Sequence, residues 1–315
     1  MSLKRGLVRA AEVLPAVAGD IVISKKKLKQ TEGLELVCMK REQRQQTLGF
    51  SSRPFVLCGL PLRRPPRDVL IHERRNGQFL LEVTGHPKLG LPFGQDRLVP
   101  IFLATLAVRQ QNPTIHFKSA AEMLDTFGLA RGGKEYRRLI ASFERIFGST
   151  IFFSTDTQTE RAKVIRRNRF NFLSEVRLWY ARNPEQRFLP GDFQNTVVLS
   201  SEFYNEVMAH PIPADLEVVK GFANAPAVLD LFLWLTYRCF TAKHEEEIPL
   251  FGTFGLVNQL GSSEYSRERR FRQKLERWLH SIRAAWPECP AVITADGCKL
   301  RIAPAQAICP QSVKK

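Results

Sequence analysis

The chain has 315 residues, of which 44% are hydrophobic and 10% aromatic, so it can bury real cores and is not disordered throughout. Its 47 Lys and Arg residues outnumber 31 Asp and Glu residues, and the formal net charge of +16 favours nucleic acid or an anionic surface as a partner. No apolar run reaches the roughly 20 residues that cross a bilayer, which excludes an integral membrane protein, and no signal-like apolar core is present, so we expect a cytoplasmic location.

Residues 1–67 are strongly basic, with 14 Lys and Arg residues against five Asp and Glu residues. They include the run SKKKLK at 24–29 and the dense proline and arginine cluster PLRRPPR at 61–67. Proline at this density is typical of a linker, so we expect a largely flexible segment. It would serve either as a non-specific solvating tail or as a DNA-contacting arm.

Residues 68–210 are expected to form a first domain, beginning with a β-hairpin around Asn76-Gly77. Apolar spacing and breakers then predict a helix, a short strand, two helices and a second hairpin. These elements are expected at residues 95–110, 114–117, 119–128 and 133–147, with the hairpin at 150–154 and 164–178. The order is that of a winged helix, in which the third helix enters a DNA groove and the hairpin contacts the backbone.

Residues 211–315 repeat that order and are expected to form a second domain, the principal DNA-reading one. A strand at 195–199 and a helix at 200–210 lead into it. Its elements are predicted at residues 226–240, 248–250, 253–260 and 262–283, with a hairpin at 292–294 and 299–302. The predicted fold class is therefore α+β, two tandem winged-helix domains after a flexible basic segment.

The predicted third helix of the second domain, residues 262–283, is amphipathic and basic. At about 100° per residue its apolar side chains fall in one sector, while Arg269, Gln273 and Arg277 lie opposite and four residues apart. Arginine can bind guanine and glutamine can bind adenine in the major groove, so these three are candidate base contacts. Arg267, Arg270 and Lys274 flank them as candidate phosphate contacts. The alternative is an ordinary solvated amphipathic helix.

Further cationic residues are candidate DNA contacts outside that helix. In the first domain they lie at the front of the third helix and on the return arm of the hairpin; in the second they lie in the hairpin. They are Arg131, Lys134, Arg137 and Arg138; Arg166, Arg167 and Arg169; and Lys299 and Arg301. We rank base contacts from the first domain lower, because Glu135 and Glu144 leave its third helix nearly neutral, with phosphate contact or protein association as competing uses.

No catalytic centre, metal site or cofactor is predicted. Six cysteines show no C-x-x-C pair and the six histidines no His-x-His pair, which counts against a metal-dependent nickase. The stretch GLARGGK at 128–134 fits the G-x-x-x-x-G-K phosphate loop. It follows a predicted helix, however, and Glu135 stands where Ser or Thr should bind magnesium, so we interpret it as a turn between helices.

Residues 91–153 carry the blocks GQDRL, ATLAV, SAAEMLDTFGL and TIFF and resemble the plasmid-encoded RepA replication initiators of Gram-negative bacterial plasmids. The resemblance continues more weakly to about residue 285. It implies two winged-helix domains that bind repeated sites (iterons) at a plasmid origin, help open the duplex, and recruit the host initiator and replicative helicase. Relatives occur as origin-binding monomers and as dimers that repress their own synthesis, and no nuclease or ATPase activity accompanies the class. Its DNA contacts carry over to Arg267 through Arg277.

The sequence therefore predicts a non-enzymatic replication initiator that binds double-stranded origin DNA. A winged-helix transcriptional repressor without initiator activity remains an alternative, because initiators often repress as well. An origin nickase or primase is the alternative from another class.

Overall fold

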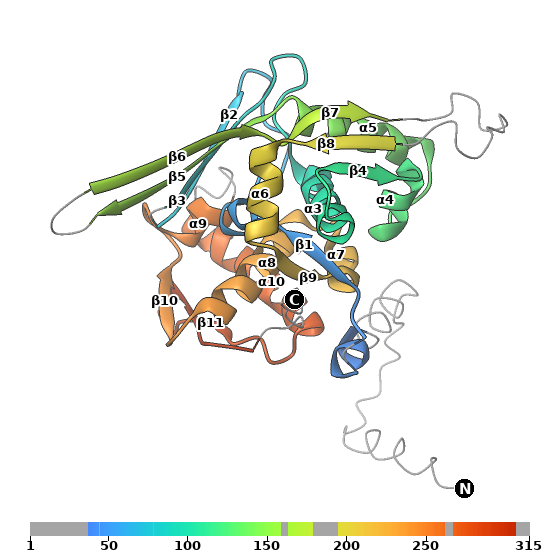
Figure 1. The fold of residues 1–315 in the computed structure, drawn as a ribbon. Helices are drawn as coiled ribbons and strands as arrows, with labels where there is room; N and C mark the ends of the chain where they lie inside the picture. The colour runs from blue at the N-terminus through green and yellow to red at the C-terminus, as the bar shows by residue number, and fades with distance from the viewer. Residues whose placement is uncertain are drawn as a thin grey trace, which may run out of the picture.

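The computed structural model describes residues 37–43, 45–77, 79–158, 163–178, 195–261 and 267–306, apart from the side chains of 155–158 and 163–168. Helices and strands alternate along the chain (Figure 1), so the architecture is mixed α and β. Within these residues the strands form four antiparallel sheets, in the orders β1-β9, β2-β3-β5-β6, β4-β8-β7 and β10-β12-β11.

The described elements have the following bounds. The helices are α2 (Arg53–Leu57), η1 (Gly94–Arg97), α3 (Leu98–Gln110), α4 (Ala120–Thr126), α5 (Gly133–Phe147), α6 (Ser201–Ala209), α7 (Leu216–Phe222), α8 (Pro226–Thr241), α9 (Leu256–Leu260) and α10 (Glu268–Ala285). The strands are β1 (Leu48–Ser51), β2 (Ile71–Asn76), β3 (Phe79–Thr84), β4 (Thr114–Phe117), β5 (Thr150–Gln158), β6 (Lys163–Asn171), β7 (Leu173–Arg177), β8 (Asn195–Leu199), β9 (Ile212–Asp215), β10 (Glu246–Pro249), β11 (Ala291–Ile293) and β12 (Lys299–Ile302).

The hairpin predicted as the wing of the first domain belongs to another sheet, so that prediction is wrong. β5 and β6 extend the β2–β3 hairpin, and the pair projects from the body of the molecule (Figure 1). Ile151 and Phe153 of β5 stand opposite Val83 and Leu81 of β3, and these four side chains are buried. Alternating apolar residues predict a hairpin but do not say which sheet it joins.

β7 and β8 form the hairpin that actually pairs with β4. β8 is the central strand, with Val197 opposite both Ile115 of β4 and Val176 of β7. The other three-stranded sheet has the strand order β10-β12-β11. In both three-stranded sheets the central strand is therefore the one that comes last in the chain. The element order predicted for the second domain is therefore present, and the first domain has the same order with β5–β6 inserted. The winged-helix assignment itself stays a prediction.

The flexible segment predicted to run to residue 67 is wrong for residues 48–60. β1 pairs with β9, and the Phe50 amide donates to Thr105 Oγ1 on α3 at 2.9 Å. From the end of α2 onward, residues 56–60 are buried. The apolar run FVLCGL overrides the basic and proline-rich composition around it, because burying it stabilises the chain more than charge at neighbouring positions destabilises it. Residues 1–36, including the SKKKLK run, lie outside the described part.

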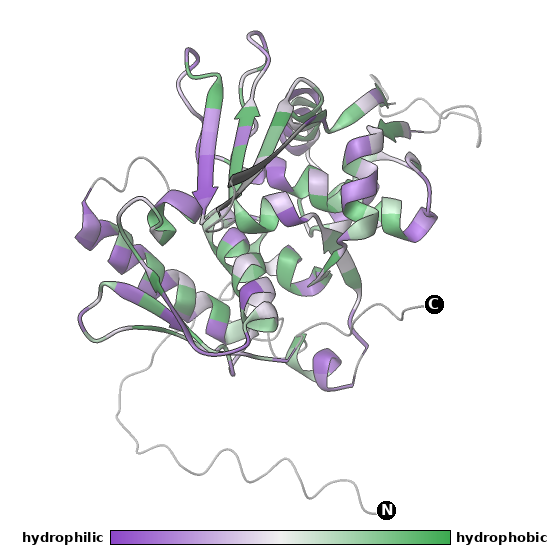
Figure 2. Ribbon diagram, turned by 60° about the vertical axis from the view of Figure 1, so that its left-hand side comes forward, coloured by the Kyte–Doolittle hydropathy of each residue, from purple (hydrophilic) through white to green (hydrophobic). Residues whose placement is uncertain are grey.

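One continuous core runs through both predicted domains. α3 is buried over most of its length, and α8 is buried from Val228 to Leu235, whereas α5 and α10 are two-sided (Figure 2). A helix that is apolar all round belongs in the interior, and a two-sided one belongs at the surface. In the described part of the chain, no helix is both long and apolar enough to cross a membrane.

A buried ion pair joins the two predicted domains. Arg97, at the end of η1, donates from Nε to Asp230 Oδ1 of α8 at 2.7 Å and from an amino group to the Leu60 carbonyl at 2.8 Å. Both charged side chains are buried, at 6% and 5% exposure. Beside them Arg74 of β2 donates to the carbonyl of Gly261, just after α9, and burial lowers the pKa of Arg74 to about 10. α8 and the end of α9 are thus fixed to η1 and β2.

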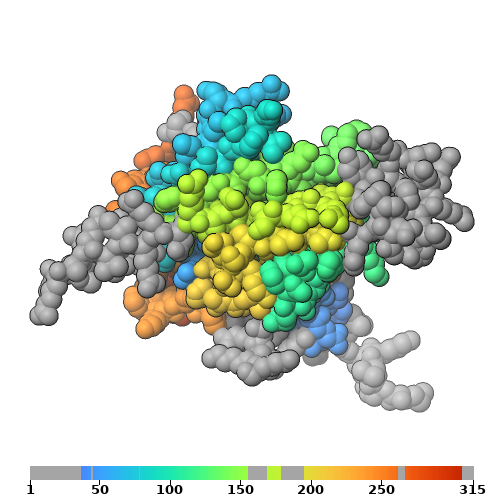
Figure 3. Space-filling model, turned by 45° about the horizontal axis from the view of Figure 1, so that its top comes forward, coloured from blue at the N-terminus to red at the C-terminus, as the bar shows by residue number. Residues whose placement is uncertain are grey.

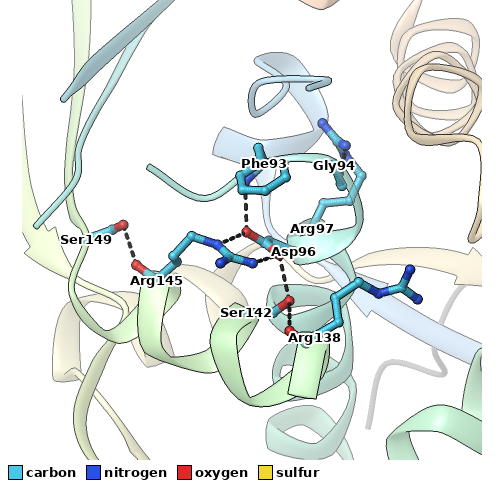
Figure 4. Close-up of polar contacts among 8 residues, drawn as sticks. All are labelled: Phe93, Gly94, Asp96, Arg97, Arg138, Ser142, Arg145 and Ser149. Carbon is cyan, nitrogen blue, oxygen red and sulfur yellow. Dashed lines mark hydrogen bonds and ion pairs between the residues drawn. The ribbon is translucent and has the colours of Figure 1, made fainter. Parts of the chain in front are cut away.

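The buried carboxylate of Asp96 fixes α5 against η1. Its carboxylate accepts hydrogen bonds from the Phe93 amide at 2.9 Å, Ser142 Oγ at 2.6 Å and Arg145 Nε at 2.6 Å (Figure 4). The Arg145 guanidinium also lies over the Phe93 ring, 4.7 Å from its centroid. Because Ser142 and Arg145 are on successive turns of α5, this buried carboxylate sets the position of that helix.

The lowered pKa of His72 leads us to expect a loss of stability in mild acid. Burial lowers its pKa to about 3, with Arg74 adding repulsion, while Nε2 donates to the Gly59 carbonyl at 3.1 Å. The unfolded chain protonates His72 near pH 6.5 and the folded chain does not, so stability is present above that pH and falls as pH drops toward 3. We expect the free energy of unfolding to decrease by up to about 1.4 kcal/mol per pH unit over that window.

Urea titrations of the wild type and His72→Gln between pH 7.5 and 4.5 measure this effect. Glutamine does not titrate in this range, so the variant should show a shallower dependence. Equal slopes for the two proteins would contradict the assignment to His72.

Candidate nucleic-acid interface

α10 is held to the body of the protein by one apolar stripe, as predicted. Phe271, Leu275, Trp278, Leu279 and Ile282 are all buried. The Phe271 ring packs edge-on against Trp278 and against Phe251, each at a centroid separation of 6.0 Å. The helix begins at Glu268, later than expected, and the first five residues of the predicted helix, 262–266, lie outside the described residues. The stripe fixes which side of α10 faces solvent.

The opposite side of α10, called here the α10 face, carries the predicted contacts. Every member is exposed, and within the described residues none makes an ion pair or a side-chain hydrogen bond. The members are Arg267, Arg269, Arg270, Gln273, Lys274 and Arg277. Because their donors are not committed to the protein, they can bind phosphate oxygens or base edges without breaking an internal contact first.

Two arginines that the prediction left out connect α10 to the β11–β12 hairpin. Arg283 donates to the Ala291 carbonyl at 2.7 Å. Arg272 packs on the hairpin turn, where a Cβ added to Gly297 would lie 2.6 Å from the Arg272 Cζ. Gly297 has φ +67°, which also favours glycine. α10 and the hairpin are therefore positioned together. No local sequence pattern distinguishes these arginines from those of the α10 face, because the hairpin contact depends on the tertiary fold.

Lys299 and Arg301 of the hairpin are less available than the sequence suggested. Glu247 of β10 accepts from Lys299 Nζ at 2.8 Å and lies 3.5 Å from Arg301 Nε. Lys299, and after it Arg301, hold the pKa of Glu247 below its usual range. The pairing arises because β10 lies beside β12, with Glu247 opposite Arg301. One carboxylate thus offsets part of the charge expected from the hairpin.

The cationic group at the front of α5 is also partly neutralised. Arg131 forms a bidentate pair with Asp125 of α4, with Nε 2.7 Å from Oδ1, and it holds the pKa of Asp125 below its usual range. Arg138 pairs with Glu135 one turn away on the same helix. Lys134 and Arg137 are exposed and, among the described residues, have no ion pair. The first domain therefore offers fewer uncommitted cations than the α10 face.

Arg169 of the first hairpin does not join the cations at the front of α5. Arg169 lines a pocket of about 730 Å³ together with Phe147 and Gly148, at the C-terminal end of α5. That end lies about 20 Å from Lys134, given a rise of 1.5 Å per residue. Around this pocket, β6 and β7 lie against α6 and β8 (Figure 3). The side chains of Arg166 and Arg167 lie outside the described part. In the described residues no group of His, Cys, Asp and Glu could hold a metal ion.

Comparison with known proteins finds one family whose description matches part of the chain. Residues 118–250, from just before α4 to just after β10, match the family described as "Plasmid encoded RepA protein". No curated protein sequence matches the chain.

Two solved structures are similar. The crystal structure of selenomethionine derivatives of domains 2 and 3 of RctB has a TM-score of 0.47 and 17% identity, over 73% of this chain and 84% of that chain. The crystal structure of RctB domains 2–3 (residues 155–483) has a TM-score of 0.42 and 13% identity, over 76% of this chain and 92% of that chain. The resemblance to plasmid-encoded RepA proteins that the sequence predicted is confirmed by the family match over residues 118–250.

Proposed function

We propose that this protein is a replication initiator that binds double-stranded DNA sequence-specifically at repeated sites (iterons) of a plasmid origin. The observation that carries the proposal is the α10 face, an exposed row of arginine, lysine and glutamine side chains uncommitted to any described residue. The family match over residues 118–250 and the formal net charge of +16 support it independently.

In this proposal α10 enters the major groove as the third helix of a winged-helix domain, residues 211–315. Arg269 and Arg277 each donate two hydrogen bonds to a guanine, at O6 and N7, and Gln273 forms two hydrogen bonds with an adenine, at N6 and N7. Arg267, Arg270 and Lys274 bind phosphates and set the register. The β11–β12 hairpin, held to α10 through Arg272 and Arg283, lies along the backbone.

The other domain, residues 68–210, has a supporting role. With Arg131 and Arg138 engaged in ion pairs, only Lys134 and Arg137 remain at the front of α5 for phosphate contacts. The rest of this domain serves self-association, as a homodimer, or docking of the host initiator and replicative helicase. Origin opening follows from DNA binding and recruitment, so the proposal requires no catalytic residue and no cofactor.

The experiment that tests the proposal is footprinting on the origin of the parent replicon. An initiator should protect several directly repeated sites, whereas a transcriptional repressor should protect a single inverted repeat at a promoter. Incubation of supercoiled origin DNA with the protein and magnesium should give no nicked or covalently attached product. A nicked product would favour the nickase alternative, and absence of any protected site would overturn the proposal.

Substitutions on the α10 face test how the helix lies on DNA. Arg269→Ala, Gln273→Ala and Arg277→Ala should each weaken binding to the specific site by about 1 to 3 kcal/mol and relax its specificity. Lys274→Ala should weaken binding to specific and random duplexes alike, because it contacts phosphate.

Gel-shift titrations on the two kinds of duplex measure the difference. Arg177→Ala is the matched control, since Arg177 of β7 is exposed, pairs with Glu175 and is not one of the proposed contacts. If all four α10 variants lose the same amount of affinity for the specific and the random duplex, the helix lies along the DNA backbone and not in the groove.

A further inference from the structure

Beyond its first turn, the basic outer side of α10 contains one acidic side chain, Glu276. Between Arg269 and Arg283 it is the only acidic residue of α10, and it is exposed. With about 100° of rotation per residue, Glu276 lies about 20° around the helix from Arg269 and about 60° from Gln273. It therefore stands in the α10 face, on the side toward the β11–β12 hairpin.

The carboxylate of Glu276 is not neutralised by its neighbours on the helix. Arg272, four residues earlier, is directed to the hairpin turn at Gly297, and Arg283, seven residues later, donates to the Ala291 carbonyl. His280, four residues later, is exposed. Within the described residues no ion pair or hydrogen bond reaches Glu276, so its acceptor oxygens are uncommitted.

A free carboxylate in this place is costly when DNA binds. In the groove it faces the phosphates of both strands, which repel it, unless it accepts a hydrogen bond that compensates. The major groove offers the cytosine N4 amino group, a donor with which Glu and Asp pair. Adenine N6 is the other amino group there, but adenine also presents the N7 acceptor beside it, which repels a second carboxylate oxygen.

We propose that Glu276 is a specificity-determining residue that accepts a hydrogen bond from a cytosine amino group in the recognised site. This inference rests on the proposed function and deepens it. Arg269, Gln273 and Arg277 favour the bases to which they can donate, whereas Glu276 penalises every duplex that lacks cytosine at one position. Part of the specificity of the α10 face therefore comes from repulsion.

A selection experiment tests the inference with full-length protein. Wild type, Glu276→Ala, Glu276→Gln and Glu268→Ala each select from a library of random duplexes, and affinities are then measured for the selected and random duplexes. Glu268 is the matched control, because it is exposed in the first turn of α10, about 80° around the helix from Glu276.

We expect the wild type to prefer a C·G pair at one position and Glu276→Ala to lose that preference by roughly 5- to 150-fold. Binding of Glu276→Ala to random duplex should stay equal or become tighter, because a repulsive charge is gone. Glu276→Gln should change the base preference at the same position toward adenine, with which glutamine forms two hydrogen bonds. Glu268→Ala should retain the wild-type preference at every position.

The inference is overturned if Glu276→Ala keeps the full wild-type preference for the C·G pair. It is also overturned if the variant binds selected and random duplexes more tightly by the same factor. In either case a wild-type consensus still supports the proposed function. If the wild type itself selects no consensus, the proposed function fails as well. Thermal melting of Glu276→Ala should match the wild type, since its side chain is exposed, and so distinguishes lost recognition from lost folding.

Discussion

Replacing Asp230 with alanine is expected to lower the free energy of unfolding by about 3 to 5 kcal/mol. The change leaves Arg97 buried and charged without its partner, which lies 2.7 Å away in the wild type. Removing one partner of a buried pair costs far more than the pair itself contributes, because the remaining charge stays out of water. Urea unfolding followed by circular dichroism measures the loss.

A surface pair provides the matched control. Asp125→Ala removes the same side chain from a bidentate pair with Arg131, but both partners are exposed. Solvent screens such pairs, so this variant should unfold at nearly the wild-type urea concentration. Replacing both Arg97 with Met and Asp230 with Leu should recover much of the stability lost by Asp230→Ala, since no unpaired charge remains. A similar decrease in the free energy of unfolding for Asp230→Ala and Asp125→Ala would contradict the conclusion that a buried ion pair joins the two predicted domains.

The affinity for DNA is expected to fall steeply with salt. Two domains that together contact about 8 phosphates give a slope near −7 in a plot of log affinity against log salt concentration. Between 50 and 200 mM salt the affinity should then drop by roughly 10⁴-fold. The reason is the release of counterions from the phosphates that Lys and Arg neutralise.

Single variants locate the phosphate contacts. Lys274→Ala should reduce the magnitude of the slope by about 1, because Lys274 on the α10 face has no competing partner among the described residues. Lys299→Ala should change the slope less, since Lys299 already pairs with Glu247 at 2.8 Å. Fluorescence anisotropy at five or six salt concentrations measures both slopes. A flat response of the wild type would rule out the phosphate-dominated binding described above.

Helices with a clear period were predicted well. α3, α5, α8 and α10 lie close to their expected positions, because apolar side chains at helical spacing must share one side to be buried. The burial of α10 through Phe271 and Trp278 follows from the same period, and it leaves Arg269, Gln273 and Arg277 exposed as expected.

The pairing of strands was predicted less well. A hairpin was expected with arms at 150–154 and 164–178; these residues do pair, as β5 with β6, but β6 ends at Asn171. The sheet that the hairpin joins depends on contacts with β3, about 70 residues earlier in the chain. Similarly, β1 is ordered because it pairs with β9, more than 160 residues later. Residues 212–222, which form β9 and α7, had no predicted element. Local periodicity contains no information on such distant partners.

The sequence by itself determined that the chain is strongly basic, that α10 is amphipathic and which of its side chains face solvent, and that residues 91–153 resemble plasmid-encoded RepA proteins. These properties depend on composition and on helical periodicity, which are local. The tertiary structure decided which cations are available. It placed Glu247 beside Lys299 and Arg301, directed Arg272 and Arg283 to the hairpin, and left Glu276 uncommitted among the arginines of α10. Whether a charge can act on a ligand depends on its neighbours in space, and strand pairing and packing set those neighbours.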